Sequence, residues 1–319
     1  TIITDKNDYS ELIKELKKFK GKTTLNFRKK MASKAYGSTA YYDAIVSEWF
    51  NRDIGLKFPE RKTFFGKKIS QLRYGENPHQ KAAIYINDFK DRETGLKKIH
   101  GKDLSFNNYS DIYSSLDILS YFKKSNTTVI IKHGNPCGVS SNRSRLSSFK
   151  NAFACDPVSA FGGIIACNFK IDKITATEIA KNFCEVVISK GFDKKALNIL
   201  KSKKNLRLIN FSKYKYLNKT IAKFFDNSFL MQEKNQRIMD SNKLRFVSKI
   251  KPSKKDLKEL EFANKVCKFV KSNAIVITKD MSTIGIGAGQ PSRLDSCKIA
   301  IQKAKLFRRN KVKNSYAAS

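Results

Sequence analysis

The sequence predicts an α/β fold that is preceded by a helical segment. The first observation is an alternation of short strand-like apolar runs with longer segments of helical periodicity, which begins after Gln71 and is typical of α/β layers. The second is a length of 319 residues with 40% hydrophobic side chains, which suffices for about two domains with buried cores. The third is the helical periodicity that dominates the chain before residue 51.

The N-terminal segment is expected to contain two helices. Residues 9–19 predict a short amphipathic helix that ends at Gly21. Thr23 and Thr24 offer an N-cap for a longer helical stretch through residue 50, which Gly37 and Ser38 could interrupt. Residues 51–70 lose the periodicity among polar residues, Gly and Pro, so they are the best candidate for a linker.

After residue 71 the predicted strands and helices alternate. The strands are expected at residues 82–86, 128–131, 163–168, 185–189, 206–210, 274–278 and 283–286. The helices are expected at residues 110–123, 175–182, 194–201, 254–270 and 292–305. The helix at 254–270 carries its apolar residues on one face, which should therefore contact the core.

The charge of the chain is extreme and invites a nucleic-acid hypothesis. The 64 basic and 28 acidic residues give a formal net charge of +36. The lysines are spread along the whole length, however, and no zinc finger or helix-turn-helix signature accompanies them. Phosphates and other small anionic ligands are therefore favoured over nucleic acid, and a basic nucleic-acid-binding protein is kept as the alternative.

The cysteines and histidines do not suggest a metal site. Six cysteines occur without a C-x-x-C pair, and the chain has three histidines. Reduced, buried thiols in a cytosolic protein are the simplest interpretation. No apolar run reaches membrane-spanning length.

The segment TVIIKHGNPCG, residues 128–138, places Lys132 and His133 at the end of a predicted buried strand. The following Gly-Asn-Pro-Cys-Gly is expected to be a turn that continues neither strand nor helix. Open α/β sheets place their ligands at the carboxyl ends of strands, so a cation and an imidazole here could form a site. The same pattern also fits two solvated residues before an ordinary turn.

Two further loops are rich in functional groups. In RYGENPHQ, residues 73–80, Arg73 could hold a phosphate and Tyr74 could support it, although Arg73 could equally pair with a surface carboxylate. In DPVSAFGG, residues 156–163, Phe161 could stack on a planar heterocycle while Gly162 lets the backbone approach it. A tight turn into a buried strand would explain the same glycines.

The segment GIGAGQPSR, residues 285–293, lies between a predicted strand and a predicted helix. Its glycines are two residues apart and Pro291 follows, so it does not fit the G-x-G-x-x-G fingerprint of nicotinamide cofactors. An anion site at the start of the helix remains compatible with it.

Six motifs in a fixed order resemble one family. They are LRYGENPHQ, GKDLSFNN, IKHGNPCG, DPVSAFGGIIACN, KFVKSNAIV and IGIGAGQPSR. On these motifs the chain resembles the bifunctional phosphoribosylaminoimidazolecarboxamide (AICAR) formyltransferase/IMP cyclohydrolase family of purine synthesis. The resemblance implies that residues 1–55 are the helical end of a cyclohydrolase domain. It implies that residues 56–319 form a cytidine-deaminase-like formyltransferase domain, with subdomains at about 70–245 and 246–319. The chain is then expected to be truncated at both ends.

The resemblance also implies a reaction and its catalytic residues. The family transfers a formyl group from the co-substrate 10-formyltetrahydrofolate to the 5-amino group of AICAR, and the product closes to IMP. The family's Lys-His pair matches Lys132 and His133, so His133 would handle the amine proton and Lys132 would stabilise developing charge. The family's Asn matches Asn273, which would orient the formyl oxygen and the carboxamide.

The resemblance further implies binding residues and partners. Arg73 and Tyr74 would contact the nucleotide, and Phe161 and Gly162 would line the heterocycle. Arg293 and Leu294 would lie at the folate and nucleotide pockets. A cytosolic homodimer without membrane or nucleic-acid partners is implied, with no metal needed for the chemistry and a monovalent cation near Ser272 left open. This chain is expected to lack cyclohydrolase activity and to hold an incomplete transferase site. An inactive fragment that only dimerises is the other alternative.

Overall fold

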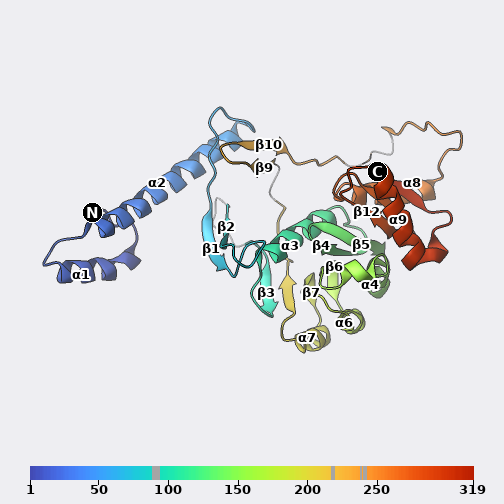
Figure 1. Cartoon of the computed structure of the whole chain (residues 1–319), viewed down its shortest axis with the longest axis horizontal. Coiled ribbons are helices and arrows are strands. Elements are labelled where there is room, and N and C mark those ends of the chain that lie inside the picture. The colour runs from blue at the N-terminus through green and yellow to red at the C-terminus, as the bar shows by residue number, and fades with distance from the viewer. Residues whose placement is uncertain (88–93, 217–219, 238, 240–242) are drawn as a thin grey trace. The chain divides into compact units, whose positions relative to one another are not determined.

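The computed structural model describes residues 1–87, 94–216, 220–237, 239 and 243–319, and these residues form two compact units. The smaller unit consists of Thr1–Gln71 and Ala83–Glu93, and the larger of Leu72–Ala82 and Thr94–Ser319. Figure 1 shows the helices of the smaller unit and the central sheet of the larger one. The predicted α/β class is confirmed in the larger unit.

The smaller unit is mainly helical. It contains a 3-10 helix at Lys6–Asp8, α1 (Tyr9–Lys18), α2 (Leu25–Asp53) and a two-stranded sheet of β1 (Lys67–Leu72) and β2 (Ala82–Ile86). Thr24 caps α2 as predicted, because its hydroxyl accepts a hydrogen bond from the Phe27 N–H. Gly37 and Ser38 do not interrupt α2, since a helix tolerates one glycine at a cost of about 1 kcal/mol. The linker expected at 51–70 is also too long, because β1 begins inside it.

The larger unit is built on one nine-stranded sheet in the order β13-β11-β12-β5-β4-β6-β7-β8-β3. The pairs β6–β7 and β7–β8 are parallel and the other pairs are antiparallel. A separate hairpin consists of β9 and β10. The strands are β3 (Lys97–His100), β4 (Asn126–Lys132), β5 (Asn135–Asn142), β6 (Ile164–Ile171), β7 (Val186–Phe192), β8 (Arg207–Asn210), β9 (Thr220–Phe224), β10 (Phe229–Glu233), β11 (Ile275–Lys279), β12 (Ser282–Gly287) and β13 (Tyr316–Ala318). The helices are α3 (Phe106–Leu119), α4 (Arg145–Phe153), α5 (Pro157–Ala160), α6 (Lys173–Ala180), α7 (Lys194–Lys201), α8 (Lys254–Cys267) and α9 (Arg293–Arg308), with a 3-10 helix at Arg309–Lys311.

The helices cover both faces of this sheet. Successive strand residues point to opposite faces, so Val129 and Ile131 of β4 pack with α3 and α8, whereas Ile130 packs with α4, α6 and α7. Helix α9 covers the β11–β12 end of the second face through Ala300 and Ala304. The helices α3 and α6 accordingly lie on opposite sides of the sheet in Figure 1.

Every predicted strand and helix of this unit is present, and all except α7 have shifted ends, but several elements were missed. Helix α3 begins four residues before the predicted start because Ser105 and Asn108 form a capping box. No helix was predicted in the DPVSAFGG segment, and it contains the short helix α5, capped by Asp156. The missed strands of the large sheet are β3, β5 and β13.

A helix–hairpin–helix pattern occurs twice in this unit. The first copy is α3-β4-β5-α4 and the second is α8-β11-β12-α9. Helices α3 and α8 each have 14 residues and begin with a capping box. Helices α4 and α9 each begin with Ser-Arg-Leu, whose serine, Ser144 or Ser292, is the N-cap. The copies meet in the sheet where β5 pairs with β12.

Candidate active site

Lys132 and His133 lie at the tip of the β4–β5 hairpin. Lys132 pairs with Asn135, so His133 and Gly134 form a two-residue turn. A two-residue turn of type I′ has positive φ at both residues, and the two values here are 53° and 73°. Gly134 adopts this conformation at no steric cost, whereas it is uncommon for histidine. The hairpin thus places an exposed imidazole next to a half-buried ammonium group.

The expected turn at residues 134–138 is wrong, because Asn135 begins β5 and the polypeptide continues as a strand. The register shifts between Ile130 and Ile131, so Cys137 is the extra residue of a β-bulge beside Pro136. A bulge is one of the places where a sheet accepts proline, which lacks the N–H of the ladder. Burial raises the pKa of the Cys137 thiol to about 12, so it is not a ready nucleophile.

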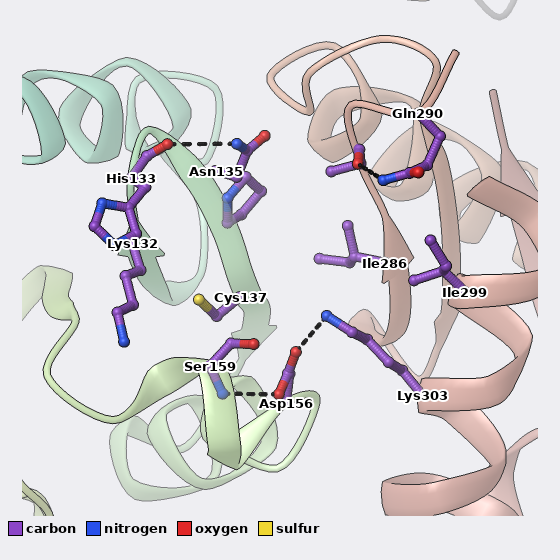
Figure 2. A pocket seen from close by; sticks show the side chains of 12 residues that line it. Lys132, His133, Asn135, Cys137, Asp156, Ser159, Ile286, Gln290, Ile299 and Lys303 are labelled. Atoms are coloured by element: carbon purple, nitrogen blue, oxygen red, sulfur yellow. Dashed lines mark hydrogen bonds and ion pairs between the residues drawn. The ribbon is translucent and has the colours of Figure 1, made fainter. Parts of the chain in front are cut away.

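A pocket of about 540 Å³ opens beside this hairpin. Strands β5 and β12 pair only at Ser140 and Ser282. The pocket lies between the parts of these strands that extend beyond this pair. Figure 2 shows Lys132 and His133 on one side of it and Gln290 and Lys303 on the other. The lining residues are Lys132, His133, Asn135, Pro136, Cys137, Asp156, Ser159, Ile286, Ala288, Gln290, Ile299 and Lys303.

Two lysines of the pocket have defined partners. Lys132 donates a hydrogen bond of 2.8 Å to the Phe161 carbonyl oxygen, which ties β4 to the DPVSAFGG segment. Lys303 of α9 pairs at 2.6 Å with the buried carboxylate of Asp156. Burial alone would raise the pKa of Asp156, but the hydrogen bonds from Lys303 and Ser159 outweigh it and hold that pKa below its ordinary value. Asp156 is therefore a charged anchor in this wall.

The side chains of Asp111 in α3 and of Asn135 at the start of β5 fix the hairpin to neighbouring segments. The Asp111 carboxylate accepts the N–H groups of His133 and Gly134. Burial raises the pKa of Asp111, and these two N–H groups partly oppose that shift. The Asn135 side-chain oxygen accepts the N–H of Lys271 at 3.1 Å. Asn135 thereby links the hairpin to the KSN segment that precedes β11.

Asn273 lies just behind the pocket wall. Its side-chain amide donates to the carbonyl oxygens of Gln290 and Pro291 at 3.0 and 2.7 Å. Asn126, at the start of β4 in the first copy, makes the matching bond to the Arg143 carbonyl oxygen at 2.6 Å. One function of Asn273 is therefore structural, because it fixes the loop that carries Gln290 into the pocket.

The other predicted binding residues do not line this pocket. Arg73 stacks on the Tyr74 ring at 5.3 Å, in a loop that Asn107 of α3 holds by a hydrogen bond to the Glu76 carbonyl. The Phe161 ring is 62% exposed and lies 5.0 Å from the Phe183 ring. The remaining three occupy exposed or half-exposed positions on the same unit: Gly162, Arg293 and Leu294. The structure thus brings together Lys132, His133 and the Phe161 backbone, whereas Asn273 anchors the Gln290 loop on the other side of the pocket (Figure 2).

Sequence reasoning missed Asp111, Asn135 and Lys303 as parts of the site. Asp111 and Lys303 are distant in sequence from the hairpin, and their partners are set by the packing of helices on the sheet. The available signal for Asp111 was an acidic residue within the buried stripe of a predicted helix, because buried carboxylates require partners. Asn135 lay inside the quoted IKHGNPCG motif without a role of its own.

Two further properties concern the described part of the chain. None of its helices is both long and apolar enough to cross a membrane. Within the same residues, no cluster of three or more His, Cys, Asp and Glu side chains could hold a metal ion. All six cysteines are free thiols and five are buried, as the sequence predicted.

Comparisons with known proteins agree on one family. The sequence model of the AICARFT/IMPCHase bienzyme family matches residues 1–303. The bifunctional purine biosynthesis protein PurH of Bradyrhizobium diazoefficiens is 41% identical over 314 residues, which cover 95% of this chain and 58% of that protein. The PurH of a Thermoanaerobacter species is 41% identical over 320 residues, which cover 100% and 62%. That of Rhizobium etli is 42% identical over 311 residues, which cover 95% and 57%. The chain spans less than two thirds of the length of these relatives.

Proposed function

Because this chain belongs to the AICARFT/IMPCHase bienzyme family, we propose that its larger unit carries the AICAR formyltransferase site of a longer purine-biosynthesis enzyme. The proposal depends on one observation: Lys132 and His133 are adjacent at a hairpin tip, and both line a pocket of about 540 Å³. A pocket of this size suits a small ligand.

The proposed reaction moves a formyl group from 10-formyltetrahydrofolate to the 5-amino group of AICAR. The amine nitrogen attacks the formyl carbon, the bond from that carbon to N10 of the folate breaks, and one proton passes from the amine to N10. The amine is a weak nucleophile because its lone pair is drawn into the imidazole ring and the carboxamide. His133 would accept the amine proton, and Lys132 would stabilise the developing oxyanion or assist protonation of the folate.

The other side chains would bind and orient the substrates. Asn273 would direct its remaining oxygen toward the carboxamide while it holds the Gln290 loop. Arg73 would bind the nucleotide phosphate through its planar fork, with Tyr74 beside it. The heterocycle would lie near Phe161 and Gly162, and the folate near Arg293 and Leu294. No metal enters this mechanism.

The proposal includes a domain organisation. Residues 1–55 would be the helical end of the cyclohydrolase domain and residues 56–319 the formyltransferase domain. The repeated helix–hairpin–helix pattern supports two cytidine-deaminase-like subdomains, at about 70–245 and 246–319. Free, mostly buried thiols are compatible with a cytosolic enzyme.

A homodimer is part of the same proposal. Arg73, Tyr74, Arg293 and Leu294 are absent from the lining of the pocket that contains Lys132 and His133. A site shared between two copies would let these residues reach the substrates from the partner. Sedimentation at several concentrations tests this point. The alternative of a basic nucleic-acid-binding protein is not favoured by the family match.

The decisive experiment is binding and turnover. AICAR binding is measured by calorimetry on this chain and on the protein as its gene encodes it, and formyl transfer is measured by release of tetrahydrofolate. We expect the encoded protein to bind AICAR and to transfer the formyl group. If that protein, with Lys132 and His133 intact, does neither, the proposed function is wrong.

A further inference from the structure

Each of the two hairpin turns rests on a buried carboxylate from the helix that precedes it. Asp111 is the sixth residue of α3, and its two oxygens accept the N–H groups of His133 at 3.2 Å and Gly134 at 2.7 Å. Glu259 is the sixth residue of α8, and it accepts the N–H of Met281 at 2.8 Å. The same device therefore occurs in both copies.

The physical need for these carboxylates follows from the turn geometry. In a two-residue hairpin the flanking residues form the ladder bonds, so the N–H groups of the two turn residues need other acceptors. The turn residues His133, Asp280 and Met281 also have φ near 53°, which is unfavourable for residues other than glycine. A buried carboxylate that accepts these N–H groups recovers part of its desolvation cost and favours this conformation.

The surroundings of the two turns differ. The Met281 carbonyl oxygen accepts the N–H of Ser141, which ties the second turn to β5, and Asp280 pairs with Lys311. The first turn instead borders the pocket through His133. A rotation of the first turn would move the imidazole relative to Lys132, whose ammonium is fixed by the Phe161 carbonyl.

We propose that Asp111 is a positioning residue that sets the conformation of the His133–Gly134 turn and thereby the place of the imidazole in the pocket. This proposal rests on the proposed function of His133. Asp111 contacts the turn backbone and is not among the residues that line the pocket, so it would act through His133. Since a misplacement of about 1 Å can cost on the order of 100-fold in rate, turnover depends on it more than binding does.

The test compares Asp111→Asn with Glu259→Gln. Each change keeps the shape of the side chain but replaces one acceptor oxygen by an NH₂ group, which cannot accept an N–H. Amide hydrogen exchange is measured at His133, Gly134 and Met281. We expect Asp111→Asn to accelerate exchange at His133 and Gly134 by roughly 10-fold or more, because both Asp111 oxygens accept an N–H and Asn keeps only one of them. Glu259→Gln should leave exchange at His133, Gly134 and Met281 within about 3-fold, because only one Glu259 oxygen accepts and Gln retains it. Unchanged exchange at His133 and Gly134 in Asp111→Asn would overturn the proposal, whatever the activity of the protein.

Kinetics of the protein as its gene encodes it complete the test. We expect Asp111→Asn to lower kcat for formyl transfer by roughly 10- to 100-fold with KM for AICAR changed by less than about 3-fold. Glu259→Gln should leave kcat within about 2-fold. Equal kcat losses in both variants would reduce Asp111 to a structural residue and overturn its positioning role. If the unmodified protein has no transferase activity, the proposed function fails, and hydrogen exchange still decides whether Asp111 holds the turn.

Discussion

The two hairpins, β4–β5 and β11–β12, share a scaffold and differ in what stands at their tips. Both have two-residue turns with positive φ, a carboxylate beneath the turn and a Ser-Arg-Leu helix start after the second strand. The first tip presents His133 to a pocket, whereas the second presents Asp280 to Lys311 at the surface. The scaffold therefore explains why both turns exist, whereas the tip residues and the pocket beside β5 distinguish the first hairpin from the second.

The largest expected effect tests whether the two helix–hairpin–helix copies pack a strand glycine against a helix in the same way. A Cβ at Gly138 would overlap the Ala152 carbonyl oxygen, and one at Gly285 would overlap the Ala300 carbonyl oxygen. We expect Gly138→Ala and Gly285→Ala each to lower the free energy of unfolding by about 3 kcal/mol, because strand and helix would have to separate. Urea unfolding measures this loss.

The matched control is Gly191→Ala in β7, where a Cβ would meet only the Lys170 side chain at an ordinary 3.4 Å. Its unfolding free energy should change by less than about 1 kcal/mol. A loss confined to one of Gly138 and Gly285 would show that the two copies do not pack alike.

A smaller effect separates structure from catalysis at the asparagines. Asn126→Ala and Asn273→Ala each remove the amide that holds the loop before the second helix, so each should cost about 1–2 kcal/mol in unfolding free energy. Only Asn273→Ala should also lower the rate of formyl transfer, measured at a temperature where both variants are folded. If both variants retain the full rate, Asn273 is a loop anchor and not a catalytic residue.

The smallest effect concerns acid stability. Burial would raise the pKa of Asp156, but the bonds from Lys303 and Ser159 together outweigh it and lower that pKa. The pKa of Asp280 is lowered first by its bond to Lys311. A lowered pKa in the folded state gives stability that is present above the ordinary carboxyl pKa of about 4 and is lost as the pH falls through the lowered value.

Lys303→Met and Lys311→Met should therefore both move acid unfolding to higher pH, as followed by circular dichroism from about pH 6 to pH 2. The shift should be larger for Lys303→Met, because Asp156 is buried and Asp280 is exposed to solvent and salt. An equal or reversed order would contradict the proposed difference between the pocket wall and the second hairpin.

Much of the scaffold could be predicted because local patterns specify it. The apolar run at residues 128–131 lies in β4, and the amphipathic pattern at 194–201 matches α7 in its bounds. Strand β5 was missed because Pro136 and Gly138 oppose strand formation locally. A bulge accommodates Pro136, and the close approach of the Ala152 carbonyl requires Gly138.

The site could be predicted only in part, because local sequence patterns specify only some of its residues. Lys132 and His133 could be singled out because they adjoin a strand end. The hydrogen bonds from the turn to Asp111 and the ion pair between Lys303 and Asp156 join segments that are remote in sequence. Such contacts depend on the order of strands and the packing of helices, which periodicity does not specify.

The central claim is that the first hairpin tip carries the proton-transfer group and the second does not. The most direct measurement is the rate of formyl transfer by His133→Ala and by Asp280→Ala in the protein as its gene encodes it, with AICAR affinity measured on the same samples. We expect His133→Ala to lose roughly 100- to 10,000-fold in kcat while its AICAR affinity changes by less than about 5-fold, and Asp280→Ala to keep its rate. Full turnover in His133→Ala, or an equal loss in Asp280→Ala, would contradict it.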